Sequence, residues 1–262
     1  MRRSLCLRID VNFPNPNPNP TLNLNPPPGG EAEDKRSKIK KGVHPGTRLE
    51  MNAVFSGPTY EQLLSGSTGW AMDEGSLFFE GKGRVHQALR KIVKRLDALE
   101  IRYAVVGGMA LVHHGYRRFT DDVDILVTRE DLDKLHREVE GLGYLPPFAG
   151  SKQLRDTELS VKIEFLTTGE FPGDGKPKPV AFPEPSSVAE EDDGIYYISL
   201  PAIITLKLAS GMTNSGRLKD LADVQELIKL KRLPKDFGDQ LPDYVRPKFT
   251  EIWDQTSSGE EP

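Results

Sequence analysis

Two aspartates separated by one residue, Asp122 and Asp124, are the residues of this chain that most directly suggest chemistry. They begin the sequence DVDILV, which reads as a β-strand. On an extended chain, residues two apart project to the same face, so the two carboxylates point together while Val123, Ile125 and Val127 face the core. Two carboxylates on one face can bind a divalent cation. Such pairs also occur by chance at strand ends and in turns, so the pair alone does not identify a site.

The residues that precede the acidic pair make the pattern more specific. Tyr103 to Val106 predict a short apolar strand, and Gly107 and Gly108 predict a turn that opens a short helix. Glycine lets the backbone approach a phosphate closely, and the amides at a helix N-terminus favour negative charge. The structural alternative is a tight turn that only needs permissive dihedrals. Arg118 and Thr120 are expected to alternate on the strand leading into the acids, where either can reach a substrate or Arg118 can brace the acidic cluster.

A third carboxylate comes from the sequence SVKIEFL at residues 160–166. Val161, Ile163 and Phe165 alternate with Lys162 and Glu164, as expected of a strand with one buried face. If this strand pairs beside the Asp-x-Asp strand, its glutamate joins the acidic pair and can bind metal or act as a base toward a hydroxyl. The alternative is an ordinary glutamate at a strand edge.

Lys207 and Arg217 carry positive charge in the last third of the chain. Lys207 lies on a helix that begins near Ser199-Leu200-Pro201, and Arg217 begins a helix that runs to Lys231. Asp220 and Asp223 are neighbours on that last helix, where they either orient the cations or complement the helix dipole. Its predicted buried stripe comprises Leu218, Leu221, Val224, Leu227 and Ile228.

The motifs GGMAL, RRFTDDVDILV, VKIEFL, LKLA and RLKDLADV, in this order, resemble the minimal nucleotidyltransferases of the DNA polymerase β superfamily. The greatest similarity is to the abortive-infection toxin nucleotidyltransferases of the AbiEii type, over residues 83–233. The resemblance implies transfer of a nucleoside monophosphate from a nucleoside triphosphate to a hydroxyl, with two Mg²⁺ ions. This chain has Gly107-Gly108 where the family more often has Gly-Ser, and Glu164 where it often has Asp.

The resemblance also implies roles for individual residues. Catalysis and metal binding fall to Asp122, Asp124 and Glu164. Lys207 is expected against the triphosphate. The full set of expected nucleotide-binding residues is Gly107, Gly108, Arg118, Thr120, Lys207, Arg217 and Asp220.

The expected partners are a nucleoside triphosphate and an acceptor, which is a tRNA, a protein or a small molecule, and a toxin-like enzyme would also have a cognate antitoxin. One alternative is a small-molecule transferase of the antibiotic-modifying kind, and another is a catalytically silent relative that acts as a regulatory module. Nucleic-acid binding alone is disfavoured because the chain has a net charge of −4 and lacks interleaved aromatic and basic residues.

Composition divides the 262 residues into five segments. We expect a disordered Pro/Asn-rich tail over 1–50, a linker or short helix over 51–82, a nucleotidyltransferase core over 83–200, a helical part over 201–255 and a disordered tail over 256–262. The expected fold is α/β, a small mixed sheet flanked by helices. Within it we expect an amphipathic helix from Gly83, a helix capped by Thr128, a loop near the site mouth over 167–193 and a short strand from Ile195 to Ile198. No stretch approaches the roughly 20 apolar residues that span a membrane, and the single cysteine, Cys6, fits a reducing cytoplasm.

Overall fold

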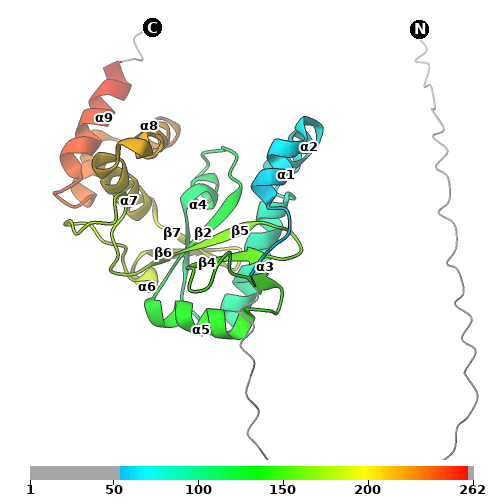
Figure 1. Ribbon diagram of the computed structural model, residues 1–262. Coiled ribbons are helices and arrows are strands. Elements are labelled where there is room, and N and C mark those ends of the chain that lie inside the picture. Colours follow the sequence, from blue (N-terminus) through cyan, green and yellow to red (C-terminus); the bar gives the residue numbers. More distant parts are fainter. Residues whose placement is uncertain (1–53, 259–262) are drawn as a thin grey trace, which may run out of the picture. The chain divides into compact units, whose positions relative to one another are not determined.

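The computed structural model describes residues 54–258 (Figure 1). The predicted tail over 1–50 lies outside these residues, as do residues 51–53 and 259–262. Among the residues described, no helix combines the length and the apolar character needed to cross a membrane.

Helices and strands alternate along most of the described chain. The α-helices are α1 (Tyr60–Gly66), α2 (Thr68–Phe79), α3 (Arg84–Ala98), α4 (Gly107–His113), α5 (Arg129–Val139), α6 (Pro185–Val188), α7 (Leu200–Thr213), α8 (Leu218–Lys231) and α9 (Arg246–Ser258). Two 3₁₀ helices cover Ser215–Arg217 and Lys235–Gln240. The strands are β1 (Ala104–Val106), β2 (Asp122–Val127), β3 (Tyr144–Leu145), β4 (Gln153–Asp156), β5 (Lys162–Thr167), β6 (Ala189–Asp192) and β7 (Ile195–Ile198).

The strands form one seven-stranded sheet in the order β3-β4-β5-β2-β1-β7-β6. β2 pairs in parallel with β5 and antiparallel with β1, while β1 pairs in parallel with β7. The sheet is therefore mixed, and the expected α/β fold with helices flanking a mixed sheet is confirmed. β2, which carries the acidic pair, has a partner on each side.

The alternation of buried residues along the central strands divides the core between the two faces of the sheet. Val123, Ile125 and Val127 pack on one face with residues of α3 and α5. Leu126 and the β1 residues Ala104 and Val106 pack on the opposite face with residues of α4, α7, α8 and α9. Figure 1 shows α3 and α5 on one side of the sheet and α4 on the other. The two aspartates of β2 share a face with Leu126, so they point toward the α4 and α7 side.

Several predicted elements are confirmed by the backbone. α3 begins one residue after Gly83, β7 has the predicted bounds, and Thr128 caps α5 by accepting a hydrogen bond from the Asp131 amide at 3.1 Å. One expectation is wrong: Arg118 and Thr120 do not lie on a strand, because β2 starts only at Asp122 and the Arg118 amide bonds to the Tyr116 carbonyl at 3.0 Å in a turn.

Five elements were not predicted from the sequence: α2, α6, β3, β4 and β6. β6 illustrates the reason, because its residues, Ala189 to Asp192, have little apolar pattern and pair only with β7 at the sheet edge. The turn between them places Asp193 at φ 50° and Gly194 at φ 74°. An Asp-Gly pair is a strong sequence signal for a hairpin because both residues tolerate positive φ. This signal marks the β6-β7 hairpin, whereas hydrophobic periodicity does not.

Candidate active site

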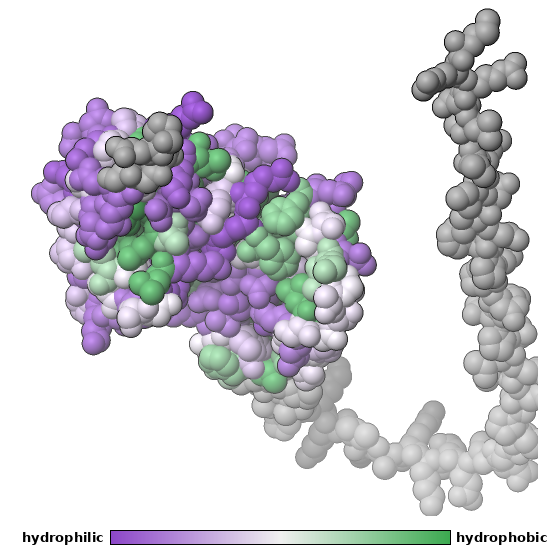
Figure 2. All heavy atoms as spheres, turned by 90° about the horizontal axis from the view of Figure 1, so that it is seen from above, coloured by the Kyte–Doolittle hydropathy of each residue, from purple (hydrophilic) through white to green (hydrophobic). Residues whose placement is uncertain are grey.

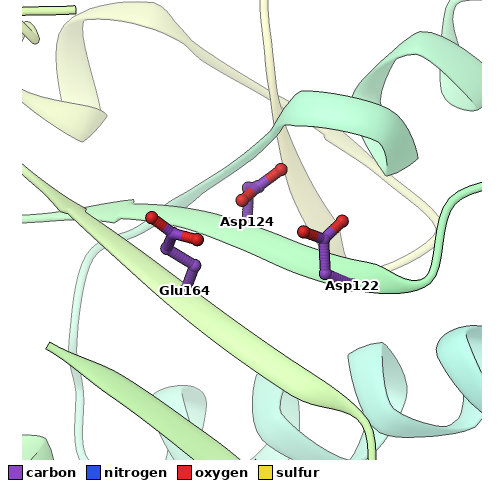
Figure 3. A group of neighbouring side chains, drawn as sticks. All are labelled: Asp122, Asp124 and Glu164. Atoms are coloured by element: carbon purple, nitrogen blue, oxygen red, sulfur yellow. The ribbon is translucent and has the colours of Figure 1, made fainter. Parts of the chain in front are cut away.

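The parallel register of β2 and β5 brings the three predicted carboxylates together. Asp124 lies directly opposite Glu164, and Asp122 lies two residues earlier on β2. Each of the three offers one oxygen within 4.8 Å of the others. Figure 3 shows the carboxylates gathered over the two strands that carry them. Hard oxygen donors at this spacing fit a Mg²⁺ ion.

Asp124 has the least compensated charge of the three. Its carboxylate accepts no hydrogen bond from any residue that the structure describes. Burial, together with the charges of Asp122 and Glu164, raises its pKa to about 7. A carboxylate that lacks donors and has two acidic neighbours is stabilised by a cation, which is a second reason that the donor set fits a metal ion.

Gly108 and Thr120 pack closely beside this cluster. A Cβ atom built on Gly108 would lie 2.5 Å from Thr120 Oγ1, so only glycine leaves room for the threonine. Thr120 Oγ1 in turn donates a 2.8 Å hydrogen bond to Asp122 Oδ1. The glycine at the start of α4 therefore has a packing role that orients the first aspartate, in addition to any contact with phosphate.

Lys162 is a member of the cluster that the sequence analysis did not identify. It lies opposite Asp122 in the β2/β5 register, and its Nζ is 3.0 Å from Asp122 Oδ2 and 3.2 Å from Glu164 Oε2. Burial alone would lower its pKa, but the two carboxylates outweigh that effect and raise the pKa above the ordinary value. The signal was present in the sequence: Lys162 is two residues before Glu164 and so projects to the same face.

Lys207 lies on α7 in a buried network of charged side chains. Its Nζ is 2.9 Å from Asp220 Oδ1 and 2.7 Å from Asp223 Oδ2, both on α8. Ser210 Oγ donates to Asp220 Oδ2 at 2.7 Å. Burial pushes the pKa of Asp220 upward, but the Lys207 charge and these hydrogen bonds hold it below its ordinary value. Two roles were open for Asp220 and Asp223, orienting the cations or complementing the helix dipole. The structure shows that both aspartates contact Lys207.

Arg118 connects the segment before β2 to the same network. Its Nε is 3.1 Å from Asp223 Oδ1, and Asp223 is only 2% exposed. Arg217 is at the edge, with Nη1 4.0 Å from Asp220 Oδ2 and a side chain that is 59% exposed. The predicted stripe of α8 needs one correction. Leu218, the first residue of α8, is 68% exposed and lies outside the buried stripe.

All ten predicted site residues line one cleft of about 700 Å³. They are Gly107, Gly108, Arg118, Thr120, Asp122, Asp124, Glu164, Lys207, Arg217 and Asp220. The carboxylates occupy one part of its wall, and the α7 and α8 cations occupy another. The surface seen in Figure 2 carries hydrophilic side chains between separate hydrophobic groups.

The cleft also has lining residues that the sequence analysis did not identify. These are mainly the cations Lys152, Lys162 and Lys219 and the aromatic residues Phe148, Phe171 and Phe182. Phe171 and Phe182 lie in the segment that was predicted as a loop near the site mouth, and their side chains form part of its wall. No local periodicity marks Phe148, Phe171 or Phe182, since they come from irregular segments.

No protein-family model matches the chain, and no curated protein sequence matches it. Among solved structures, a protein of Thermotoga maritima provisionally described as a nucleotidyltransferase aligns over 56% of this chain and 89% of its own, with 19% identity and a TM-score of 0.34. The aminoglycoside enzyme ANT(2″)-Ia, solved with adenylyl-2″-tobramycin, aligns over 67% of this chain and 98% of its own, with 14% identity and a TM-score of 0.35. Likeness at this level transfers no residue roles to this chain.

Proposed function

We propose that this protein is a metal-dependent nucleotidyltransferase that moves a nucleoside monophosphate from a nucleoside triphosphate to a hydroxyl acceptor. The observation that carries the proposal is the register that places Asp122, Asp124 and Glu164 within 4.8 Å of one another. The same cleft is lined by Lys207 and Arg217, so acids for a metal ion and cations for a triphosphate face one space of about 700 Å³.

The three carboxylates would hold Mg²⁺. When bound, this ion supplies neutralisation of phosphate charge and a lower pKa for a bound hydroxyl. Glu164 is the residue proposed to accept the proton of the acceptor hydroxyl. A bond forms between the acceptor oxygen and the α-phosphorus, the bond from that phosphorus to the bridging oxygen breaks, and pyrophosphate leaves with the electron pair.

Lys207 is proposed to bind the triphosphate. An ammonium group has three hydrogen-bond donors. Lys207 uses two of them to donate to Asp220 and Asp223. The third donor remains for a phosphate oxygen. The aspartates would then act as positioning residues that fix the lysine, while Gly107 and Gly108 bring backbone close to the phosphates.

For the acceptor, we propose a tRNA or a protein, as for a toxin-like enzyme with a cognate antitoxin that acts in the cytoplasm. The exposed cations Arg217 and Lys219 line the cleft and suit a polyanionic acceptor. A small-molecule acceptor is the second candidate, favoured by the net charge of −4, which gives the whole protein no attraction to nucleic acid. The intact carboxylate cluster disfavours a catalytically silent relative.

The test is to incubate the purified protein with Mg²⁺, each α-labelled nucleoside triphosphate, and in turn total tRNA, cell-lysate protein and a pool of hydroxylated small molecules. Label should move to one acceptor class, and Asp122→Ala should abolish the transfer. Asp133→Ala, which changes an exposed aspartate of α5 outside the cleft, should transfer as the wild type does. A folded Asp122→Ala variant with full activity would contradict the proposal.

A further inference from the structure

Lys162 is fixed beside the carboxylates by the backbone and not only by its flexible side chain. β5 is an interior strand, paired with β2 on one side and β4 on the other. In this register Lys162 faces Asp122 as Glu164 faces Asp124. Residues two apart on a strand share a face, so the lysine and the glutamate both project over the cluster. No rotation of the strand could turn Lys162 away while Glu164 remained there.

The surroundings of Lys162 differ from those of an ordinary surface lysine. Its side chain is 24% exposed, whereas that of Lys82, which pairs with Glu80 on the surface, is 70% exposed. The Lys162 ammonium bridges Asp122 Oδ2 and Glu164 Oε2. Thr120 donates to the other oxygen of Asp122, Oδ1, so both oxygens of Asp122 and one oxygen of Glu164 have a partner. Among the described contacts, both oxygens of Asp124 and Oε1 of Glu164 remain available.

The charges of the cluster then balance one divalent ion. Three carboxylates contribute three negative charges, and the lysine ammonium removes one, which leaves two. One Mg²⁺ neutralises that remainder. Two ions together with the ammonium would place five positive charges beside three negative ones, and like charges at this distance repel strongly in a partly buried site.

We infer that Lys162 takes the place of one of the two metal ions expected for this site, so that the free protein holds a single divalent cation. This inference rests on the metal site of the proposed function. The ion would be held by Asp124, by Glu164 Oε1 and by Asp122 Oδ1, which has a second lone pair beside the one that accepts from Thr120. Lys162 is then a positioning residue that limits the number of bound ions.

The test counts bound Mn²⁺ in the full chain by electron paramagnetic resonance, without nucleotide. The wild type should bind one ion at the cluster, and Lys162→Met, which keeps the length of the side chain but removes its charge, should bind two. Lys162→Arg should restore a count of one. Lys152→Met is the matched control, because Lys152 also lines the cleft but pairs with Glu170, and its count should stay at one.

A count of two in the wild type would overturn the inference, even if Lys162→Met failed to fold. A count of one in folded Lys162→Met, or of zero in both proteins, would also overturn it. The count does not depend on nucleotidyl transfer. A wild type with one ion and a Lys162→Met variant with two would support the role of Lys162 even if the transfer assay showed no activity. If transfer is active but the two ion counts are equal, only the inference about Lys162 is rejected, and the proposed function stands.

Discussion

The Asp124 carboxylate occupies the space that a side chain on Gly107 would need. A Cβ atom built on Gly107 would lie 1.8 Å from Asp124 Oδ2, and the residue has a φ of +58°, in the left-handed region. Asp124 lies on β2, and Gly107 begins α4 directly after β1, whose last residue, Val106, lies opposite Asp124. The first glycine of the turn is thus required by the second aspartate of the acidic pair.

Gly107→Ala should therefore damage both stability and the carboxylate cluster. The left-handed backbone costs an alanine about 1–2 kcal/mol, and the displaced aspartate adds to the loss. We expect a lower free energy of unfolding in urea and weaker Mn²⁺ binding. Gly169→Ala is the control, since Gly169 has a φ of +82° but no atom within 4 Å of its Cβ position. It should lose stability but keep Mn²⁺ affinity. Equal Mn²⁺ affinity in both variants would contradict the packing argument.

Asp124→Asn should abolish transfer and yet stabilise the metal-free protein at alkaline pH. A folded-state pKa of about 7, against 3.8 for an ordinary aspartate, means that the stability this group contributes is present at low pH and lost as the pH rises through about 7. Asparagine cannot ionise, so the variant escapes that loss. Thermal unfolding with a chelator should give a higher Tm than the wild type at pH 8 and a smaller difference at pH 5.5. If the Tm difference between the variant and the wild type is the same at pH 8 and pH 5.5, the pKa of Asp124 is not raised as described.

Asp223→Ala should be strongly destabilising. The buried Lys207 and the partly buried Arg118 both contact the Asp223 carboxylate, and the substitution removes this shared partner. Breaking a buried ion pair from one side typically costs about 3–5 kcal/mol. Glu226→Ala on the same helix removes only an exposed pair with Lys229, and surface pairs contribute about 0–1 kcal/mol. Urea denaturation of the two variants compares them, and similar losses would show that the network adds little to the fold.

His114 should make the protein less stable at mildly acid pH. Burial lowers its pKa below the usual 6.5, against the opposing effect of the hydrogen bond from Nε2 to the Ile198 carbonyl at 2.8 Å. The fold holds the imidazole neutral, so stability is lost as the pH falls through about 6.5, where the unfolded chain takes up the proton.

His114→Gln keeps a donor for the carbonyl but cannot titrate. The free energy of unfolding, measured in urea at pH 7.5 and pH 5.5, should therefore fall less for this variant than for the wild type. Identical falls in the two proteins would show that His114 does not contribute to the acid sensitivity.

The sequence alone determined the features that depend on local periodicity. Alternation along β2 placed Asp122 and Asp124 on one face and Val123 in the core, because the period of a strand is a property of the backbone. The Thr128 cap of α5 and the amphipathic α3 also followed from neighbouring residues. The edge strand β6 was missed because it has no apolar pattern, although the Asp193-Gly194 turn that follows it marks a hairpin.

Only the tertiary structure decided how distant segments meet. The parallel register sets Glu164 opposite Asp124 and Lys162 opposite Asp122, and a shift of one residue would have turned both β5 side chains to the other face. Arg118 reaches Asp223 across 105 residues of sequence. Local periodicity carries no signal of such a contact, because the packing of the folded chain selects the partner. The sequence therefore determined the residue types of the site, and the register of the sheet determined their charge balance.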